Sequence, residues 1–334
     1  MKNGIETSDM KKGTEISNMK KEIETSTINN ETDISSIKKE TLHINGVLNI
    51  FKNKGMTSFD VVRKIKFLAN EKKVGHTGTL DPEATGVLPV CLGKATKTID
   101  YIMDSRKVYE VTLLLGTKTT TYDLEGEVIE TRETNHLTEE EVSEVVLSFI
   151  GEYDQVPPMY SALKKNGVRL YDLARQGIEV EREARRINIF NISDLKIELP
   201  YVYMKVACSK GTYIRSLCYD IGEKLDVCGT MAGLNRAETS IFKQEDSVNI
   251  EDLTKENIQN YIITIEEALS FYPKITINSS FTKLLVNGVK VFDKRLTNEK
   301  REKNVLYRVY DSEKIFIGIG KQDDEGFKIE KLLI

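Results

Sequence analysis

The stretch Gly75-His76-Thr77-Gly78-Thr79-Leu80-Asp81-Pro82-Glu83-Ala84-Thr85-Gly86 is the most informative part of this chain. Glycine permits backbone conformations that other residues avoid, and proline fixes its own φ. A segment rich in both predicts an ordered loop rather than a helix or a sheet strand. Because proline biases the preceding residue toward extended geometry, Asp81 should project its carboxylate outward from the loop. From the residues alone, Asp81 is either a reactive group on a rigid loop or an aspartate that accepts backbone N–H bonds in a turn.

Length and composition indicate an ordinary globular protein. The chain has 334 residues, which suggests about two domains, each large enough to bury a core. It has no apolar run near the roughly 18 residues that a membrane span requires, and its N-terminus is polar, so neither a membrane anchor nor a secretory signal is expected. The four cysteines form no Cys-x-x-Cys pair, and with only three histidines a zinc site is not expected. We expect a cytoplasmic protein with reduced, mostly buried cysteines.

The charge is unevenly distributed along the chain. The net charge of −4 argues weakly against a nucleic-acid partner. However, lysine and arginine outnumber acidic residues in 51–73, 161–186 and 281–303, whereas residues 123–152 are strongly acidic. Local basic patches attract polyanions even on an acidic protein. Solvated helix faces and loops would explain the same pattern.

The N-terminal segment repeats with a period of nine, as MKNGIETSD, MKKGTEISN, MKKEIETST and INNETDISS. It holds too little apolar surface to offset the entropy of ordering. Residues 1–41 are therefore predicted to form a disordered nonapeptide-repeat extension. The expected organisation then continues with a main domain over 42–250, a linker or helical connection over 251–273, and a small β-rich domain over 274–334.

Helices and strands alternate irregularly in the body of the chain, which predicts an α+β fold. Helices are expected over 58–70 with Ser58 as the N-cap, over 138–150 with a capping box at Thr138-Glu139-Glu140-Glu141, and over 215–226. A further short helix is expected to end near residue 177. Strands are expected over 44–51, 107–115, 186–199, 202–209, 234–243, 305–310, 315–319 and 327–333.

Several common chemistries are excluded. Residues 86–94 superficially resemble a phosphate-binding P-loop, but six residues rather than four separate Gly86 from Gly93, and Ala95 stands where serine or threonine would bind magnesium. No dinucleotide-binding G-x-G-x-x-G, no G-x-S-x-G and no H-E-x-x-H motif occurs. No cofactor or metal is therefore expected. The chemistry that is left is a carboxylate-centred reaction or plain binding.

Six segments resemble motifs of the TruB family of pseudouridine synthases, in the family's order. Residues 75–86 resemble the loop that holds the family's catalytic aspartate. The other five are Lys52-Asn53-Lys54-Gly55-Met56-Thr57-Ser58, Lys107-Val108-Tyr109, Pro157-Pro158-Met159-Tyr160-Ser161-Ala162-Leu163-Lys164, Tyr171-Asp172-Leu173-Ala174-Arg175-Gln176-Gly177 and Lys210-Gly211-Thr212-Tyr213-Ile214-Arg215-Ser216-Leu217. The resemblance covers about residues 44–245, and the tail from about 274 is similar to the PUA-type RNA-binding domain of bacterial members. It implies a pseudouridine synthase fold, with a mixed, mainly antiparallel central sheet flanked by helices and a small C-terminal PUA-like domain.

Three positions depart from the family pattern. Asn53 replaces a usual proline, and Asn235 and Ser240 stand where arginine and glycine are common. None of the three is a catalytic position of the family. The departures therefore affect the expected loop geometry and RNA contacts rather than the expected reaction.

The resemblance implies that the protein converts uridine to pseudouridine at position 55 in the T loop of tRNA, without a cofactor or metal. The C1′–N1 bond breaks, the uracil rotates, and C5 joins C1′. In this interpretation Asp81 is the nucleophile and Arg215 keeps it ionised. Tyr109 would stack on the flipped base and serve the later proton transfer at C5.

Substrate contacts are implied in the same way. His76 would support the flipped nucleotide, and Tyr213 and Leu234 would line the uracil pocket. Phosphate contacts are expected from Lys52, Lys164, Lys165, Arg169 and Arg175. The protein is expected to act as a monomer on the T arm of tRNA, away from membranes and without an obligate protein partner. Two other hypotheses are a tRNA-binding folding helper without catalysis and a base glycosylase that releases free uracil.

Overall fold

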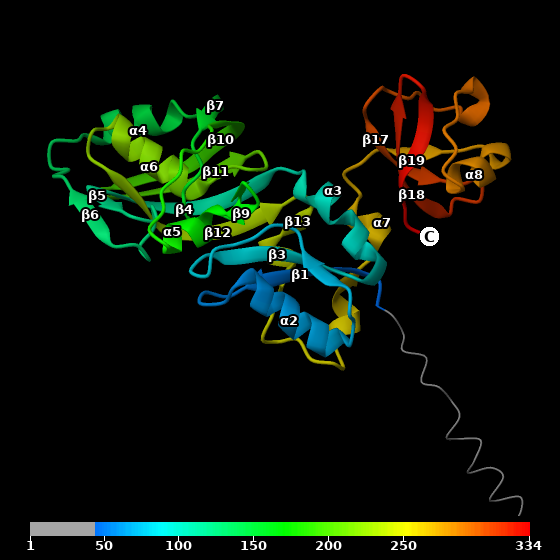
Figure 1. Ribbon diagram of the computed structural model, residues 1–334, viewed down its shortest axis with the longest axis horizontal. Coiled ribbons are helices and arrows are strands. Elements are labelled where there is room, and N and C mark those ends of the chain that lie inside the picture. The colour runs from blue at the N-terminus through cyan, green and yellow to red at the C-terminus, as the bar shows by residue number, and fades with distance from the viewer. Residues whose placement is uncertain (1–43) are drawn as a thin grey trace, which may run out of the picture. The chain divides into compact units, whose positions relative to one another are not determined.

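A mixed sheet of eleven strands is the largest element of the computed structural model, which describes residues 44–334 (Figure 1). The predicted extension over 1–41 lies outside the described residues. The main path of the sheet runs β14-β1-β3-β12-β4-β11-β10-β7, and its neighbours pair antiparallel except β14 with β1 and β3 with β12. The strands are β1 (Gly46–Lys52), β2 (Val74–His76), β3 (Thr85–Leu92), β4 (Lys107–Leu115), β7 (Gly151–Gln155), β10 (Arg185–Glu198), β11 (Tyr201–Cys208), β12 (Gly229–Thr239), β13 (Phe242–Lys243), β14 (Val248–Asn249) and β15 (Ile262–Ile263).

Helices cover the sheet and close its main hydrophobic core. Helix α4 packs on β10, α6 packs on β12 and β4, and α4 touches α6, while α2 contacts β2 (Figure 1). Apolar side chains of all three helices join one buried cluster with the sheet. The α-helices are α2 (Ser58–Ala69), α3 (Ile99–Met103), α4 (Glu139–Leu147), α5 (Leu170–Arg175), α6 (Ile214–Lys224), α7 (Ile265–Ala268) and α8 (Ser279–Val286). Short 3-10 turns are η1 (Gly93–Thr98), η2 (Gln244–Asp246), η3 (Ile258–Tyr261) and η4 (Lys294–Leu296).

Strand β4 lies at the centre of the sheet and agrees with its predicted range. It pairs with β11 on one side and with β12 on the other. Its odd-numbered residues, among them Tyr109, Val111 and Leu113, are buried. The alternation that identified the strand in the sequence therefore also places Tyr109 on the core face of the sheet.

The helix caps agree with the sequence in one case and differ in the other. The predicted capping box at Thr138 is present at the start of α4, where Thr138 and Glu141 bond reciprocally. Helix α2, however, is capped by Thr57, whose side chain accepts from the Asp60 N–H, and not by Ser58 as predicted. Adjacent hydroxyl residues offer equivalent caps in a sequence, and here Ser58 is instead occupied by the neighbouring loop.

Strand β12 begins at Gly229, five residues before the start that the sequence predicted at residue 234. The five residues 229–233 include two glycines and one alanine, which have low strand propensity, and the strand here lies close to helix α6. A Cβ atom on Gly229 would lie 2.3 Å from the carbonyl oxygen of Cys218. At its far end the strand turns at Ser240, whose φ of 57° separates β12 from the short β13. Tertiary packing, not local propensity, sets this strand.

The glycine-rich stretch is a loop only in its middle. Its first residues join β2, where His76 pairs with Val90, and its last residues begin β3. The prediction of a loop throughout 75–86 was wrong at both ends, because backbone pairing with the neighbouring strands overrides the glycine content.

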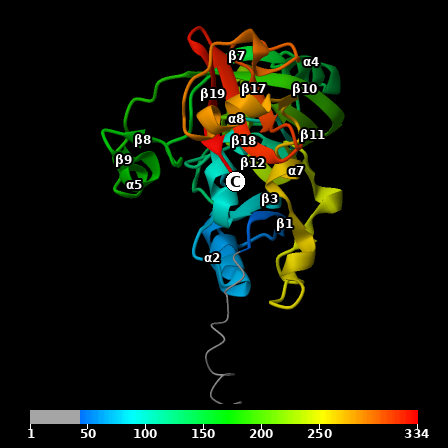
Figure 2. The same ribbon diagram turned by 90° about the vertical axis from the view of Figure 1, so that its right-hand side faces the viewer.

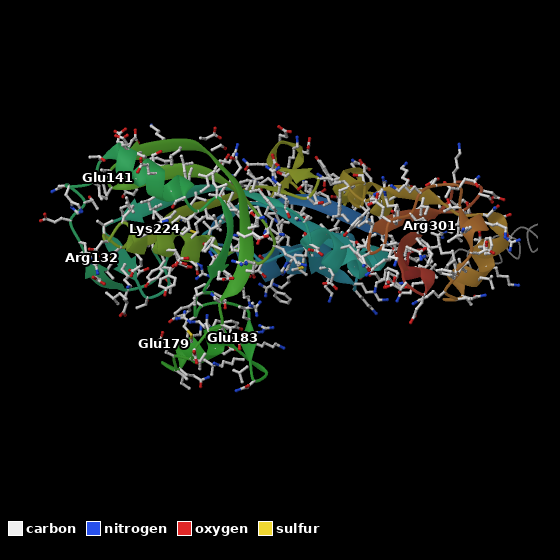
Figure 3. All side chains as sticks on the ribbon, turned by 90° about the horizontal axis from the view of Figure 1, so that it is seen from above. Arg132, Glu141, Glu179, Glu183, Lys224 and Arg301 are labelled. Atoms are coloured by element: carbon white, nitrogen blue, oxygen red, sulfur yellow. The ribbon has the colours of Figure 1, made fainter. Side chains whose placement is uncertain are left out.

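Two small hairpins lie outside the large sheet. One pairs β5 (Thr117–Thr119) with β6 (Val128–Thr131). The other pairs β8 (Lys164–Lys165) with β9 (Val168–Arg169) and leads directly into α5, the short helix expected before Gly177. Figure 2 shows β8, β9 and α5 standing away from the large sheet. In Figure 3 the labelled Glu179 and Glu183 lie in the same projecting part.

A separate four-stranded sheet forms the C-terminal part of the chain, in the order β16-β17-β18-β19. The three strands predicted there are present, and a fourth, β16, pairs parallel with β17. Apolar side chains from the sheet and from α8 form a core of their own. The strands are β16 (Lys274–Thr276), β17 (Leu306–Tyr310), β18 (Phe316–Asp323) and β19 (Gly326–Leu332). The domain boundaries at 250 and 273 stay predictions.

The four cysteines are free and buried, as expected. Burial raises the pKa of Cys91 to about 12 and that of Cys208 to about 11. These thiols are therefore protonated and unreactive at neutral pH. Within residues 44–334, no helix is long and apolar enough to cross a membrane.

Candidate active site

The loop that carries Asp81 is fastened on both sides of that residue. Before it, the Ser58 hydroxyl accepts from the Leu80 N–H at 2.9 Å and lies 3.2 Å from the Leu80 carbonyl oxygen. After it, the Pro82 carbonyl oxygen accepts from the Gly55 N–H at 2.9 Å. These bonds tie the loop to the start of α2 and to the turn before it. The Asp81 carboxylate is therefore presented by a backbone that is held in place.

Lys52 supports the loop from beneath. Its side chain is fully buried, and its ammonium group donates to the carbonyl oxygens of Asn53 at 3.0 Å, Met56 at 2.7 Å and Pro82 at 3.1 Å. Burial lowers the pKa of Lys52 to about 8, although the nearby Asp81 carboxylate opposes that shift. These bonds occupy the ammonium group next to the Asp81 loop, and the predicted phosphate contact of Lys52 stays a prediction.

We expect Lys52→Met to loosen the loop without removing an RNA contact. Three carbonyl oxygens lose a donor, so the melting temperature should fall by about 5 °C, and kcat should fall about tenfold with little change in KM. Calorimetry and steady-state kinetics measure both effects. Lys54→Met is the matched control, because Lys54 is exposed and forms a surface ion pair with Glu83. A change confined to KM would instead support the hypothesis that Lys52 contacts an RNA phosphate directly.

Arg215 lies between two carboxylates. Its Nε is 3.1 Å from Oδ2 of Asp81, and its Nη2 donates to Oδ1 of Asp81 at 3.3 Å. On the other side, its Nη1 is 3.4 Å from Oδ2 of Asp123. The Arg215 and Asp123 side chains are each 9% exposed and that of Asp81 is 32% exposed, so the Asp81 end of the network is the accessible one.

Helix α6 carries Arg215 in its first turn, and backbone carbonyls complete the surroundings of the guanidinium group. Nη2 donates to the Tyr160 carbonyl oxygen at 2.8 Å, and Nη1 donates to the Thr121 carbonyl oxygen at 3.3 Å. Both acceptors belong to loops that are distant from Asp81 in the sequence. Arg215 therefore joins three loops to one helix, and its fork geometry fixes the orientation of the Asp81 carboxylate.

The charge state of Asp81 is set by opposing effects. Burial raises the pKa of Asp81, Arg215 lowers it, Asp123 raises it and Lys52 lowers it, and the result lies above the ordinary value of an aspartate. Arg215 thus opposes the desolvation of Asp81 without cancelling it. A raised pKa makes the carboxylate more basic than an exposed aspartate while leaving it able to ionise.

We expect Asp123→Asn to move the acid limb of the pH–rate profile to lower pH. Removing the second carboxylate takes away a charge that raises the pKa of Asp81, so Asp81 stays ionised to lower pH, by about half a pH unit or more. At neutral pH the rate should fall about tenfold, because the amide pairs poorly with Arg215. Profiles of kcat/KM from pH 5 to 8 measure both. Glu125→Gln is the control, and an acid limb that moves upward would contradict the network.

Asp81 opens onto a cavity of about 1020 Å³ with a basic lining. Asp81 is the only acidic residue among the residues that line it. The lining includes the five residues besides Asp81 to which the sequence gave a role at the target nucleotide, namely His76, Tyr109, Tyr213, Arg215 and Leu234, and two of the expected phosphate contacts, Lys164 and Arg169. Basic side chains from several elements surround them: Lys107, Lys164, Arg169, Lys210 and Arg236. The structure thus gathers residues from positions 76 to 236 around one space.

A second cavity, of about 630 Å³, has the opposite character. It shares Asp81 and Leu234 with the first, but carboxylates dominate its lining: Glu83, Glu110, Asp123, Glu125 and Asp194 stand against Lys54 and Lys205. A polyanion is attracted by the basic cavity and repelled by the acidic one. The two cavities that meet at Asp81 therefore differ in the sign of the charge that they favour.

Arg236 lies beneath the basic cavity and was overlooked in the sequence. It is 1% exposed, and it donates from Nε to the Val87 carbonyl oxygen at 2.7 Å and from Nη2 to the Gly78 carbonyl oxygen at 3.2 Å. It also pairs with Tyr109 across the strands. Its backbone approaches Gly86 so closely that a Cβ there would lie 2.3 Å from the Arg236 carbonyl oxygen. Arg236 thereby holds both ends of the Asp81 loop to the sheet.

Burial sets the protonation of the two ring residues beside the loop. Burial lowers the pKa of His76, and the positive charge of Arg236 lowers it further, so the imidazole is neutral at neutral pH. Burial raises the pKa of Tyr109 despite the opposing charge of Arg236, so the ring is a neutral phenol. Aromatic side chains are surfaces on which a nucleobase can stack.

Some predicted residues lie elsewhere, and others were missed. Lys165 donates to the Glu181 carbonyl oxygen and Arg175 lies over the Tyr171 ring, so neither lines the basic cavity. Asp123 was missed because it opens the acidic segment 123–152, where a count of charges hides a single buried carboxylate. Ser58 was assigned to a helix cap because the loop it binds follows some twenty residues later in the chain.

Family models and known proteins match this chain along nearly all of its described length. The family model of the TruB family pseudouridylate synthase N-terminal domain matches residues 66–214. The tRNA pseudouridylate synthase B C-terminal domain matches 215–270, and the pseudouridine synthase II TruB C-terminal domain matches 273–329. A tRNA pseudouridine synthase B of Clostridium perfringens (strain SM101 / Type A) is 62% identical over 292 residues, which cover 87% of this chain and 99% of that relative. The chain belongs to the TruB family.

Other relatives and solved structures agree with this assignment. A tRNA pseudouridine synthase B of Clostridium tetani (strain Massachusetts / E88) is 57% identical over 291 residues, covering 87% of this chain and all of the relative. A chain of a solved Cbf5-Nop10-Gar1 complex shares 27% identity and a TM-score of 0.67, covering 86% of this chain and 85% of its own. A chain of an H/ACA RNP bound to a substrate RNA containing 2′-deoxyuridine shares 25% identity and a TM-score of 0.66, with the same coverage.

The TruB assignment confirms the family that the sequence motifs suggested and the predicted fold class. The fold is a pseudouridine synthase fold with a mixed, mainly antiparallel sheet, flanking helices and a β-rich C-terminal domain. As a member of this family the chain is an enzyme, a pseudouridine synthase, and therefore an isomerase.

Proposed function

We propose that this enzyme converts uridine 55 in the T loop of tRNA to pseudouridine, with Asp81 as the nucleophile. The observation that carries the proposal is the Asp81–Arg215–Asp123 network at a cavity that is otherwise basic. The substrate class follows from the relatives named tRNA pseudouridine synthase B. The position in the T loop is the one that the TruB resemblance implies.

The reaction needs a carboxylate, a shielded space and no external reagent. The C1′–N1 bond breaks, the C5–C1′ bond forms, C5 loses a proton and N1 gains one, so nothing is released. Asp81 supplies the nucleophile, and its elevated pKa favours attack by a basic carboxylate. Arg215 orients that carboxylate and stabilises its charge.

The base would be held by the rings and backbone around Asp81. Tyr109 offers a buried neutral ring on which a flipped uracil can stack, worth roughly 1–3 kcal/mol. Tyr213 and Leu234 line the same cavity, from the start of α6 and from β12. His76 would contact the flipped nucleotide as a neutral imidazole. This stacking offsets part of the few kcal/mol needed to unstack the uridine.

The RNA backbone would enter over the basic cavity. Lys164 and Arg169, which the sequence already indicated as phosphate contacts, line this cavity together with Lys210 and are candidates for phosphate contacts. The enzyme would act on the T arm as a cytoplasmic monomer, without a cofactor, a metal or an obligate protein partner. The C-terminal domain would extend the RNA contact without taking part in the chemistry.

Pseudouridine mapping on a T-arm RNA tests the proposal. The purified protein should convert the target uridine quantitatively and leave the mass of the RNA unchanged. Free uracil in the supernatant would indicate a glycosylase, and RNA binding without any product would indicate a folding helper. Replacing the target uridine by cytidine supplies the negative control.

A further inference from the structure

Helix α6 begins without a side-chain cap, although it carries Arg215. Its N-cap is Tyr213, whose side chain makes no capping hydrogen bond. The first N–H groups of a helix have no partner within the helix, and an unsatisfied buried donor is costly. The start of α6 must therefore be fixed from outside.

Gln155 supplies that fixation. It is the last residue of β7 and is 1% exposed. Its Oε1 accepts from the Tyr213 N–H at 2.8 Å, and its Nε2 donates to the Tyr213 carbonyl oxygen at 3.1 Å. The amide thus bonds both backbone groups of one residue, as a neighbouring strand would. Only a side chain that has a donor and an acceptor side by side can do this.

The same amide extends into a buried chain of polar groups. Nε2 of Gln155 also donates to the Tyr153 hydroxyl at 2.7 Å, and the Tyr153 side chain lies near the Asp220 carboxylate on α6. Just after Gln155, the Val156 carbonyl oxygen accepts from the Ser216 hydroxyl at 2.8 Å. The end of β7 and the residue after it therefore form hydrogen bonds to the start of α6 on both sides of Arg215.

We propose that Gln155 is a positioning residue for the isomerisation: it sets the start of α6 so that Arg215 meets Asp81. This inference rests on the proposed function of Asp81 and Arg215. Gln155 touches neither the carboxylate nor the cavity, because it does not line the basic space. It acts through Tyr213, two residues before Arg215.

Gln155→Glu distinguishes positioning from bulk packing. An ionised glutamate accepts from the Tyr213 N–H but repels the Tyr213 carbonyl oxygen, whereas a protonated glutamate donates its one O–H to that oxygen and so keeps both bonds to Tyr213, although not the bond to Tyr153. The titratable and charged groups around it are Tyr153 on β7, Arg185 opposite it on β10, and Tyr213, Arg215 and Asp220 from α6 and its cap. The activity of this variant should therefore depend on the protonation of the introduced carboxyl group.

The experiment measures kcat for pseudouridine formation at several pH values, as a ratio of variant to wild type at each pH. Gln155→Met should be slowed about 30-fold at every pH, with KM within about threefold of wild type. Gln155→Glu should be slowed about 30-fold at pH 8.5 and recover to within about fivefold at pH 6. Glu152→Met, on the exposed face of the same strand, is the matched control and should behave as wild type.

Each outcome bears on the inference. A Gln155→Met protein with wild-type kcat overturns it, and so does a Gln155→Glu ratio that does not change with pH. If Gln155→Met fails to fold, the isosteric Gln155→Glu variant and its pH dependence decide. A wild-type protein that forms no pseudouridine contradicts the proposed function instead, so the two failures can be told apart.

Discussion

Asp81→Asn should bind tRNA as wild type does and form no detectable pseudouridine. The substitution keeps the size of the side chain and its contact with Arg215 but removes the negative charge that attacks the substrate. Loss of a nucleophile typically costs on the order of 10⁴-fold or more in kcat. Because the amide still fills the same space, affinity measured by filter binding or fluorescence anisotropy should change little. Single-turnover assays with excess enzyme measure the chemical step directly.

Glu83→Gln is the control for Asp81→Asn. Glu83 lies two residues later in the same loop, but its carboxylate makes only an exposed ion pair with Lys54. We expect its rate to stay within about threefold of wild type, because surface ion pairs contribute little. Pseudouridine formed by Asp81→Asn at more than a trace would remove Asp81 from the nucleophile's role, and slow deamidation is excluded by mass analysis of the protein.

Arg215→Met should have the second-largest effect, a fall in kcat of about 10³-fold. The guanidinium group pairs with both Asp81 and the buried Asp123, so its loss leaves the two carboxylates without the positive charge between them. It also removes a charge that lowers the pKa of Asp81. The remaining activity should therefore show an acid limb moved to higher pH, opposite to the shift expected for Asp123→Asn.

Arg215→Lys separates charge from geometry. Lysine keeps the positive charge but cannot form the fork that spans Asp81, Asp123 and the Tyr160 carbonyl oxygen. We expect a loss of about 10²-fold in kcat, together with a smaller shift of the acid limb than in Arg215→Met. Equal rates for the methionine and lysine variants would mean that charge contributes nothing, and a wild-type rate for Arg215→Lys would mean that the fork is dispensable.

Local patterns in the sequence predicted much of the fold. The alternation over 107–115 predicted the bounds of β4, and the capping box at Thr138 predicted the start of α4. Strand patterns also predicted three of the strands of the C-terminal domain. These features depend on neighbours within a few residues. The predictions failed where distant segments compete, as at Ser58, whose hydroxyl binds Leu80 instead of capping a helix, and at Gly229, whose strand depends on packing against α6.

The residues of the candidate site likewise fall into those that a local motif identifies and those that only long-range contacts identify. Asp81, Tyr109 and Arg215 were recognisable because each lies in a short motif with its own composition, and so was the TruB family itself. The residues that position these three side chains were not recognisable in the sequence. Asp123, Arg236 and Gln155 contact residues that are from 58 to 158 positions away in the chain, and no local pattern marks such contacts. Long-range hydrogen bonds and burial leave almost no trace in composition or periodicity.

The sequence by itself thus determined the chemistry on offer: one carboxylate on a rigid loop, one arginine at the start of a helix and one tyrosine on a strand. Only the tertiary structure decided how these groups work together. It buries Lys52 as a support for the loop, places Arg215 between two carboxylates, and raises the pKa of Asp81 despite that arginine. The physical reason is that desolvation and charge pairing depend on three-dimensional proximity, which a linear order of residues does not state.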